Sequence, residues 1–405
     1  SAVAFDTIRR YFEYCGYTVN YISNFTDVDD KIIKAANEAG ISTKELSDKF
    51  IAAFMEDTGQ LGIKPATQNP RVINYMDEII AFVSTLVDKG FAYVSEGDVY
   101  FRVAKSNNYA KLANKTLEDL EIGASGRTDA ETERKENPLD FALWKAAKEG
   151  EVSWDSPWGP GRPGWHIECS VMATEILGDT IDIHGGGADL EFPHHTNEIA
   201  QSEAKTGKTF ANYWMHNGFV NVDNEKMSKS LGNFVTVHDM LQTVDGQVLR
   251  FFLATQQYRK PINFTEKAIH DAEVNLKYLK NTHSLPLTEQ VNQAELQTYL
   301  DTFQEAMDDD FNTANGVTVL FDMAKWINSG NYDQTVKDAF EKMLQVFGIV
   351  FEEEVLDEDI EKLIEERQAA RANKDFATAD RIRDELAAQG IKLLDTKEGV
   401  RWTRD

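Results

Sequence analysis

The order strand, turn and helix constrains the fold of this chain more than any other feature. A β-rich run over Tyr17–Phe25 leads into a polar turn at Thr26, and a helix is expected after it. A second short strand is expected from Thr180, and it runs into three glycines. This order is typical of a doubly wound parallel sheet, which binds ligands where its strands end. We therefore expect an α/β, Rossmann-like domain, preceded by a helix over residues 1–16.

The β/α pattern is interrupted by an inserted segment over residues 66–159. A helix is expected over Asn69–Lys89 and a hairpin over Phe91–Val103, turning at Glu96-Gly97-Asp98. The segment Trp154–Trp165 is rich in Trp, Pro and Gly. Because proline removes a backbone donor and glycine relaxes φ, we expect no regular element there. The expected α/β domain comprises residues 1–65 and 160–235.

Helical periodicity dominates the remainder of the chain. We expect a connector over 236–265, a helical bundle over 266–351 and a small α+β domain over 352–405. The acidic run Glu352–Asp359 is expected to be a solvated linker. In the last domain, a helix over 363–389 should stop at Gly390, and a hairpin should follow.

Charge and composition exclude several classes of protein. A net charge of -26 argues against a protein that coats nucleic acid non-specifically. No apolar run of about 18 residues is present to span a bilayer, and no secretory leader is evident. The two cysteines, Cys15 and Cys169, are too few for a disulfide framework. We expect a cytoplasmic protein with no membrane partner, and any nucleic-acid partner would meet local basic patches.

A polar loop over Glu225–Phe234 carries two lysines that flank Met-Ser, Lys226 and Lys229. When a nucleophile attacks the α-phosphate of ATP, negative charge builds on the departing pyrophosphate. Ammonium groups on a mobile loop can stabilise that charge in the transition state. We interpret both lysines as catalytic and ATP-binding candidates, and an ordinary solvated loop is the alternative.

A zinc site is suggested by Cys169, His194 and Glu198. Thiolate, imidazole and carboxylate are a suitable donor set, and the last two residues share one helical face because they are four apart. From spacing alone His195 is an alternative ligand, and adjacent histidines can also be ordinary satisfied polar residues. The other thiol, Cys15, is expected to be a buried structural residue.

Two more polar residues, His184 and Asp189, flank the three glycines that lie between the candidate metal ligands. A turn without side chains at the end of a strand lets a ligand approach the backbone closely. We expect both residues in a pocket, although a simple tight turn is the alternative. For Thr26, Asp27 and Asp29, the alternative to a binding role is capping of the next helix.

The motifs of this chain, taken in order, closely resemble those of cysteinyl-tRNA synthetases, which are class I aminoacyl-tRNA synthetases. The loop with Lys-Met-Ser-Lys-Ser resembles the signature loop of that class. The resemblance covers essentially the whole chain. Its motifs are Asn24–Asp30, Asn137–Lys145, Ser156–Ser170, Asp182–Leu190, Pro193–Ala200, Lys226–Ser230, Met307–Thr313 and Lys374–Asp384.

The resemblance implies roles for the residues of the expected pocket. Cys169, His194 and Glu198 match three of the family's four zinc ligands, which favours His194 over His195. The fourth ligand, a cysteine, is expected upstream of Ser1, together with the family's His-Ile-Gly-His-like signature. The resemblance also places Trp165 in the wall of the cysteine pocket, Thr26 near the substrate backbone, and His184 with Asp189 around the amino acid, ATP or adenylate.

The activity that the resemblance implies is ligation of L-cysteine to tRNA(Cys) in two steps, with Mg²⁺ accompanying ATP. Zinc would bind the substrate thiolate and so separate cysteine from serine, which a pocket based on shape separates poorly. Residues 236–265 would contact the tRNA stem, and 352–405 would bind the anticodon. There Arg401 and Trp402 offer a guanidinium and a stacking face, although Trp402 can equally pack the hairpin onto its helix. We expect a monomer.

Two alternatives to this activity stay open. A cysteine ligase of the mycothiol pathway resembles the catalytic part and uses the same zinc logic, but it gives no reason for an anticodon-binding tail over 352–405. The other alternative is a tRNA-binding fragment without catalytic activity, because the upstream signature is not in the sequence.

Overall fold

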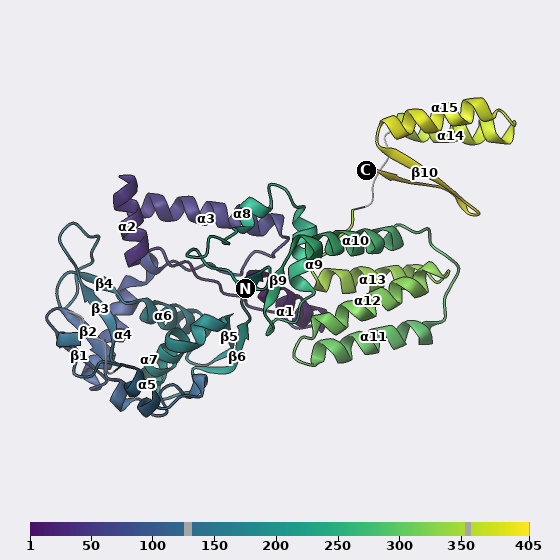
Figure 1. The fold of residues 1–405 in the computed structure, drawn as a ribbon. Coiled ribbons are helices and arrows are strands. Elements are labelled where there is room, and N and C mark those ends of the chain that lie inside the picture. The colour runs from purple at the N-terminus through teal and green to yellow at the C-terminus, as the bar shows by residue number, and fades with distance from the viewer. Residues whose placement is uncertain (125–131, 353–357, 405) are drawn as a thin grey trace. The chain divides into compact units, whose positions relative to one another are not determined.

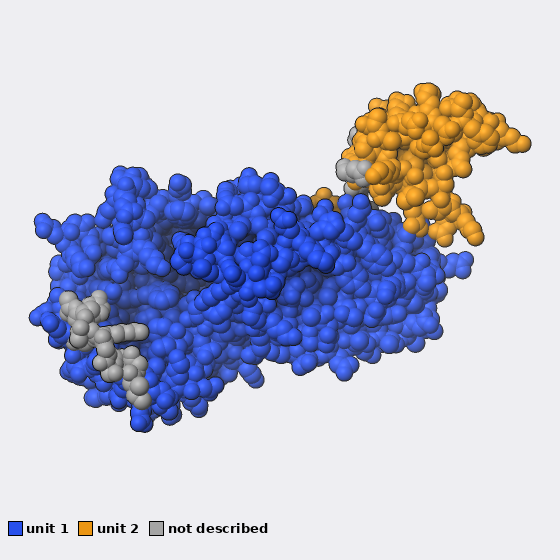
Figure 2. Space-filling model, in the orientation of Figure 1, with its two compact units in different colours: residues 1–350 blue, residues 351–405 orange. Residues whose placement is uncertain are grey.

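The structure, a computed structural model, describes residues 1–124, 132–352 and 358–404. The chain forms two compact units, Ser1–Val350 and Phe351–Asp405, which are coloured separately in Figure 2. Each unit has its own apolar core. Within the described ranges, every helix is too short or too polar to cross a membrane.

The α/β part of the first unit is built around two parallel strands, β5 (Ile181–Gly187) and β6 (Ala211–Asn217). Helix α6 (Trp165–Leu177) contacts β5, and α7 (Thr196–Thr206) packs beside α6 (Figure 1). The expected first helix is α1 (Ala2–Tyr14). After it come α2 (Asp30–Ala39) and α3 (Thr43–Gln60), each capped at its first turn by a side-chain oxygen, of Asp29 and Ser42.

The strand predicted over Tyr17–Phe25 is largely wrong. Among the described residues, this run forms only isolated parallel bridges, one joining Ile22 to Gln68 and one joining Phe25 to Arg71. The Phe25 N–H donates to the Pro70 carbonyl at 2.9 Å. Because Pro70 has no N–H to donate in return, a regular ladder cannot continue at this point. The same pairing keeps residues 69–71 extended, so the predicted helix over Asn69–Lys89 begins later.

The inserted segment folds as an antiparallel sheet with a covering helix. Its helix α4 (Met76–Asp88) follows a 3-10 turn over Val72–Tyr75. The predicted hairpin is confirmed as β1 (Ala92–Ser95) and β2 (Asp98–Phe101), and its turn residues Glu96 and Gly97 both have positive φ. The other strands, in the sheet order β1-β2-β3-β4, are β3 (Phe141–Ala146) and β4 (Gly161–Pro163).

The strand β4 corrects the prediction that the Trp-, Pro- and Gly-rich segment holds no regular element. It pairs with β3 through three residues at the edge of the sheet. An edge strand tolerates Pro163 because one side of its backbone needs no partner. A Cβ at Gly161 or Gly164 would overlap β3, so the glycines permit the close approach that forms this strand.

A connector and a helical bundle complete the first unit. The strands β7 (Val220–Val222) and β8 (Glu225–Lys226) lie in the last part of the expected α/β domain. The connector over 236–265 contains α8 (Val237–Met240), α9 (Gly246–Ala254) and β9 (Ile262–Phe264). The bundle contains α10 (Glu266–His283), α11 (Gln293–Asp308), α12 (Thr313–Asn328) and α13 (Gln334–Val346). Its centre is apolar and fully buried, with Phe303, Leu320, Phe340 and Phe347 all at 0% exposure.

The inserted segment also contains a short helix, α5 (Leu117–Ala124).

The second unit contains α14 (Glu358–Ala372), α15 (Phe376–Ala388) and a hairpin of β10 (Ile391–Thr396) and β11 (Gly399–Arg404). The single helix predicted over 363–389 is wrong, because Lys374 has a φ of 61° and Asp375 caps a new helix. The predicted hairpin is confirmed. Residues 353–357 of the expected acidic linker lie outside the described residues.

Candidate active site

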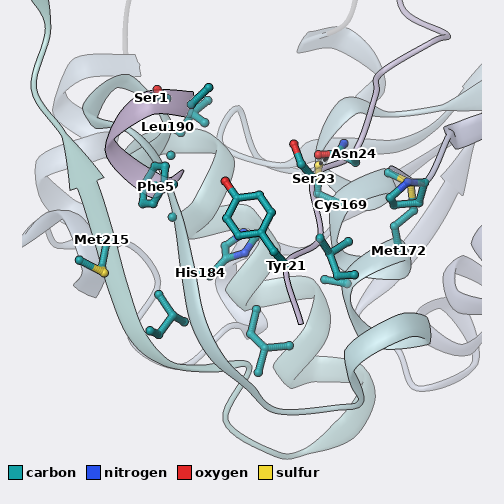
Figure 3. Close-up of a pocket in the computed structure, with 18 of the residues that line it drawn as sticks. Ser1, Phe5, Tyr21, Ser23, Asn24, Cys169, Met172, His184, Leu190 and Met215 are labelled. Carbon is teal, nitrogen blue, oxygen red and sulfur yellow. Dashed lines mark hydrogen bonds between the residues drawn. The ribbon is translucent and has the colours of Figure 1, made fainter. Parts of the chain in front are cut away.

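A cavity of about 1770 Å³ opens in the first unit between α1, β5 and the extended run after α1 (Figure 3). Most residues that line it are apolar or aromatic, and polar and charged side chains, including imidazoles, a thiol and carboxylates, lie among them. Thr26, predicted to be near the substrate, is among them. Among the lining residues, the potential metal ligands that lie close to one another are Cys169, His184, His194, His195 and Glu198.

Three of these residues form a group that could hold a metal ion. Cys169 lies on α6, His194 lies just before α7, and Glu198 lies in the first turn of α7. Their ligand atoms all lie within 4.8 Å of one another, and His194 Nε2 is 3.3 Å from Glu198 Oε2. His194 lies in the helical turn over Glu191–His195 that leads directly into α7, so it shares a face with Glu198, which is four residues later. Cys15 is exposed at the end of α1, so the prediction that it is buried is wrong.

The protonation of this group suits a divalent cation. Burial lowers the pKa of His194, so its imidazole is neutral at pH 7 and has a lone pair to offer. Burial raises the pKa of Glu198, but the adjacent His184 imidazole outweighs burial, and the pKa lies below its usual value. Burial and the Glu198 charge raise the pKa of the Cys169 thiol well above its usual value. A cation would remove this penalty on the thiolate, so the donor set fits zinc.

Further imidazoles surround the same carboxylate. His184 Nε2, on β5, lies 3.1 Å from Glu198 Oε1, and His195 Nε2 lies 3.7 Å from Oε2. His195 Nδ1 is in turn 2.8 Å from His216 Nε2. Burial lowers the pKa of His195 to about 3, so it also stays neutral. His195 therefore groups with His184 and Glu198, whereas His194 groups with Cys169 and Glu198.

Neighbouring side chains hold the thiol and the His194 imidazole in place. Asn24 Nδ2 lies 3.7 Å from Cys169 Sγ, and the two residues lie next to each other in Figure 3. His166 Nδ1 lies 2.9 Å from His194 Nδ1, which leaves His194 Nε2 facing the carboxylate. Trp165, half exposed at 46%, packs its ring 4.2 Å from that of His194. Such outer contacts fix the orientation of ligands.

The glycine triplet is part of a strand, which corrects the prediction of a turn. Gly185, Gly186 and Gly187 are the last three residues of β5, paired with β6. A Cβ at Gly185 would lie 2.6 Å from the Phe5 ring, and one at Gly186 would lie 3.3 Å from His195 Cε1. The glycines therefore let α1 and the imidazole cluster approach the strand closely.

The remaining predicted pocket residues lie around this centre in different ways. Asp189 lies in a 3-10 turn directly after β5, close to Gly187. Unlike His184, neither Asp189 nor Trp165 is among the described residues that line the cavity. Asp29 caps α2, as the capping alternative predicted. Asp27 does not cap that helix, because it is buried in an ion pair with Arg71.

The loop with Lys226 and Lys229 is exposed and shaped by its own polar groups. The Ser228 N–H donates to Asn233 Oδ1 at 2.9 Å, and Asn233 Nδ2 donates to the Lys226 carbonyl at 3.2 Å. Lys226 Nζ lies 4.4 Å from the centre of the Phe219 ring. Lys229 Nζ lies 5.4 Å from that of Phe234. Neither lysine is among the described residues that line the cavity.

In the second unit, Trp402 packs against a small apolar core on one side of the hairpin. This core consists of Ile360, Ile382, Leu386 and Ile391. Arg401 is half-buried, and its neighbour across the hairpin is Leu394, which is 58% exposed. The packing alternative for Trp402 is thus consistent with the structure, while a role of either residue with tRNA stays a prediction.

Sequence reasoning gave no role to three residues that complete the site. His166 is three residues before Cys169 on α6, so helical spacing could have identified it. Asn24 is the first residue of the motif Asn24–Asp30, but its contact with the Cys169 thiol depends on the path of the irregular run after α1, which local sequence does not predict. His216 reaches His195 because β6 places it opposite Gly186 of β5, a pairing that no local pattern reveals.

Comparison with known proteins relates every part of the chain to one group of enzymes. Residues 1–274 match the family described as tRNA synthetases class I (C) catalytic domain. Residues 302–352 match the DALR domain, and residues 353–402 match the cysteinyl-tRNA ligase anticodon binding domain.

Individual relatives agree with these matches. The chain is 95% identical over 405 residues to a cysteine--tRNA ligase of Streptococcus thermophilus strain CNRZ 1066, spanning 100% of this chain and 91% of that protein. It is 81% identical to a cysteine--tRNA ligase of Streptococcus agalactiae serotype III, with the same coverage. A Mycobacterium tuberculosis methionyl-tRNA synthetase in complex with methionyl-adenylate superposes with a TM-score of 0.62 at 15% identity, covering 85% of each chain. This last likeness is one of fold, and it confirms the predicted α/β class.

Proposed function

The chain belongs to the cysteine--tRNA ligase family, and we propose on this basis that it joins L-cysteine to tRNA(Cys) at the expense of ATP. In the first step, a carboxylate oxygen of cysteine attacks the α-phosphorus of ATP, and the bond to pyrophosphate breaks. In the second, a terminal ribose hydroxyl of tRNA attacks the cysteinyl carbonyl carbon, and AMP leaves with the bonding electron pair. Neither step needs a side chain as nucleophile, so positioning and charge stabilisation carry the chemistry.

The observation that carries this proposal is the group of Cys169, His194 and Glu198 at the wall of the cavity. These three residues would hold Zn²⁺, which supplies a soft cation that prefers the substrate sulfur to a serine oxygen. Asn24 and His166 would keep the thiolate and imidazole ligands oriented. Selectivity would then follow from the chemistry of the donor atom, where a shape-based pocket gains little.

The other pocket residues would bind and orient the substrates. Thr26 lines the cavity and would contact the backbone of cysteine. Trp165, whose ring packs on that of His194, would form part of the wall around the substrate side chain. His184 and Asp189 would contact the amino acid or nucleotide. Lys226 and Lys229 would stabilise the pyrophosphate as it leaves, with Mg²⁺ bound to ATP. Because both ammonium groups lie over aromatic rings outside the cavity lining, the loop has to move when ATP binds.

Each part of the chain would have a separate role in the reaction. Residues 1–65 and 160–235 form the catalytic domain in this proposal, and 66–159 are its inserted domain. The connector 236–265 contacts the tRNA stem and leads to the bundle over 266–351. Residues 352–405 bind the anticodon, which agrees with the family match of that region.

The proposal is tested by ATP–pyrophosphate exchange with the full-length protein. We expect exchange that depends on cysteine and is at least about 10²-fold slower with serine at equal concentration, because zinc would bind the sulfur of cysteine in preference to the oxygen of serine. Exchange that is independent of the amino acid, or equally fast with serine, would contradict the proposed specificity.

The tail offers a separate prediction. Deleting residues 352–405 should leave cysteine-dependent pyrophosphate exchange nearly intact, because that step needs no tRNA and the first unit has its own core. For aminoacylation, the free energy of tRNA recognition should fall by several kcal/mol, because each contact with a base contributes about 1–3 kcal/mol. Kinetics of both reactions measure the effect.

The control for the deletion is a pair of substitutions at one residue. Trp402→Phe retains a stacking ring and an apolar contact with the core, whereas Trp402→Ala removes both. If both variants and the truncated enzyme aminoacylate tRNA as efficiently as the parent, residues 352–405 do not contribute to tRNA recognition, and Trp402 has only a structural role in its own unit.

A further inference from the structure

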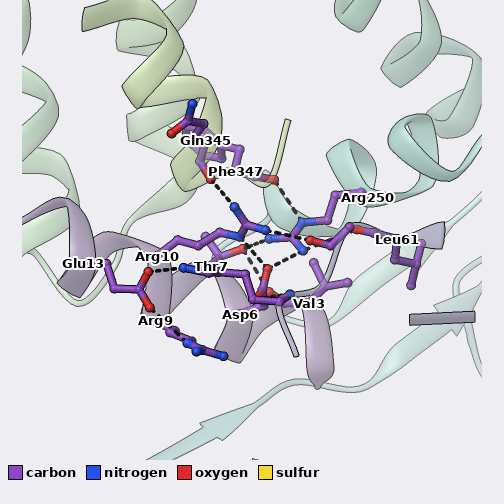
Figure 4. Close-up of polar contacts among 12 residues, drawn as sticks. Val3, Asp6, Thr7, Arg9, Arg10, Glu13, Leu61, Arg250, Gln345 and Phe347 are labelled. Carbon is purple, nitrogen blue, oxygen red and sulfur yellow. Dashed lines mark hydrogen bonds and ion pairs between the residues drawn. The ribbon is translucent and has the colours of Figure 1, made fainter. Parts of the chain in front are cut away.

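The first unit contains a fully buried ion pair that the proposed chemistry does not use. Arg250, on α9, has 0% exposure, and Asp6, on α1, has 2%. Arg250 Nη1 lies 2.6 Å from Asp6 Oδ2 (Figure 4). Burying two charges costs desolvation free energy, so such a pair persists only when its remaining hydrogen bonds are also satisfied.

The remaining hydrogen bonds of Arg250 run to segments from distant parts of the sequence. Its Nε donates to the Phe347 carbonyl at 3.0 Å, directly after α13. Its Nη2 donates to Thr7 Oγ1 at 3.2 Å, on α1. One guanidinium therefore joins the connector, the α/β domain and the last helix of the bundle.

A second arginine crosses the same junction. Arg10 Nε donates to Asp6 Oδ2 at 2.8 Å, and its Nη1 and Nη2 donate to the carbonyls of Gln345 (3.2 Å) and Gly62 (2.7 Å). The Gln345 carbonyl lies in the last turn of α13, and Gly62 lies two residues after the end of α3. The C-terminal end of a helix carries partial negative charge, which favours a guanidinium there. Both arginines thus bind the end of the bundle to α1.

The junction requires close backbone approach. Gly348 has a φ of 75°, and a Cβ at this position would overlap the guanidinium of Arg250. The position is therefore restricted both by its backbone conformation and by the ion pair. A residue with a side chain would have to displace Arg250 or move the end of the bundle.

The other side of α1 contacts the candidate site. The Phe5 ring packs on Gly185 of β5, the residue next to His184, whose imidazole is 3.1 Å from Glu198. Asp6, which follows Phe5 directly, holds the junction. A continuous series of packed groups therefore runs from the end of α13 through α1 to the carboxylate of the metal group.

The recognised motif Met307–Thr313 supports the same connection from another side of the bundle. Tyr11 Oη, on α1, donates to Asp308 Oδ1 at 2.5 Å. The Phe311 ring packs against Tyr11 and Phe12, at 6.0 and 5.5 Å between ring centres. Helix α1 is therefore held by the bundle both at the loop before α12 and at the end of α13.

We propose that Asp6, Arg10 and Arg250 are positioning residues that couple the helical bundle to the substrate pocket through α1. This inference rests on the proposed function, in which the bundle follows the connector that contacts the tRNA stem and precedes the domain that binds the anticodon. Coupling of this kind matters for the step in which tRNA meets the adenylate. Activation of cysteine, which occurs without tRNA, depends on it far less.

The test compares two reactions in the same full-length variants. Arg10→Gln removes the contacts with Gln345 and Gly62 but keeps the Arg250–Asp6 pair, so it should fold. Arg250→Lys keeps the charge without the fork of donors. We expect kcat for tRNA aminoacylation to fall at least 10-fold more than kcat for cysteine-dependent pyrophosphate exchange in both variants.

The matched control is Arg102→Gln in the inserted segment. Arg102 also binds a carboxylate and a carbonyl, those of Glu136 (2.9 Å) and Gly90 (2.9 Å), but has no contact with the bundle among the described residues. This variant should lower the two rates equally, if at all. Equal losses in Arg10→Gln and Arg250→Lys would overturn the coupling, whereas absence of exchange in the parent enzyme would overturn the proposed function instead.

Discussion

Replacing Lys229 by alanine should slow adenylate formation by about 10²–10³-fold, the usual cost of removing one donor that stabilises transition-state charge. The affinity for cysteine should change little, because the ammonium acts on charge that develops only as pyrophosphate leaves. Single-turnover formation of cysteinyl-adenylate measures this rate. The fold should be unaffected, since Lys229 is exposed and its nearest aromatic neighbour is Phe234 at the surface.

Two further variants of the loop sharpen this prediction. Lys229→Arg keeps the positive charge and should recover part of the rate. Phe234→Leu removes the ring over which the ammonium lies and should leave the adenylation rate near that of the parent. An unchanged rate in Lys229→Ala would refute the catalytic role and return the loop to an ordinary solvated segment.

Replacing Cys169 by serine should reduce kcat/KM for cysteine activation by more than the 10–100-fold that loss of an outer contact of a metal site typically costs. The substitution is nearly isosteric, yet it exchanges a soft sulfur donor for a hard, weakly acidic hydroxyl. Discrimination against serine should weaken at the same time. Exchange kinetics with both amino acids measure the two effects.

The other cysteine provides the matched control. Cys15→Ser makes the same chemical change at an exposed position at the end of α1. Its exchange kinetics should equal those of the parent. If both variants behave alike, the thiol of Cys169 has no role in selecting the substrate.

The sequence correctly predicted those elements whose conformation is determined by a few neighbouring residues. The hairpin at Glu96-Gly97 follows from residues that accept positive φ, and the i, i+4 spacing of His194 and Glu198 follows from helical geometry. The α/β class followed from the order of strand and helix, of which β5 is confirmed and the strand over Tyr17–Phe25 is largely wrong. The family was identified from ordered motifs, and the comparisons confirm it.

Features that depend on distant backbone were missed. The glycines after His184 are strand residues because β6 pairs with them, and Gly161 belongs to a strand because β3 is its neighbour. The run after α1 stays irregular because Pro70 lies opposite it. Composition around Lys374 did not reveal that this residue would take a left-handed conformation and divide the predicted helix.

The contacts around the metal group show the same limit. Helical spacing from Cys169 would have been enough to find His166, but His216 reaches the cluster only through the pairing of two strands. The Arg250–Asp6 pair joins residues far apart in the chain, and nothing in either local sequence indicates it.

The zinc content of the full-length protein, purified without chelators, tests the central claim most directly. The group of Cys169, His194 and Glu198 predicts about one zinc per chain in the parent and in Cys15→Ser, measured by elemental analysis. Cys169→Ser and Glu198→Gln should lose most of it. A parent enzyme that activates cysteine without zinc, or a Cys169→Ser variant that keeps its full zinc content, would contradict the account.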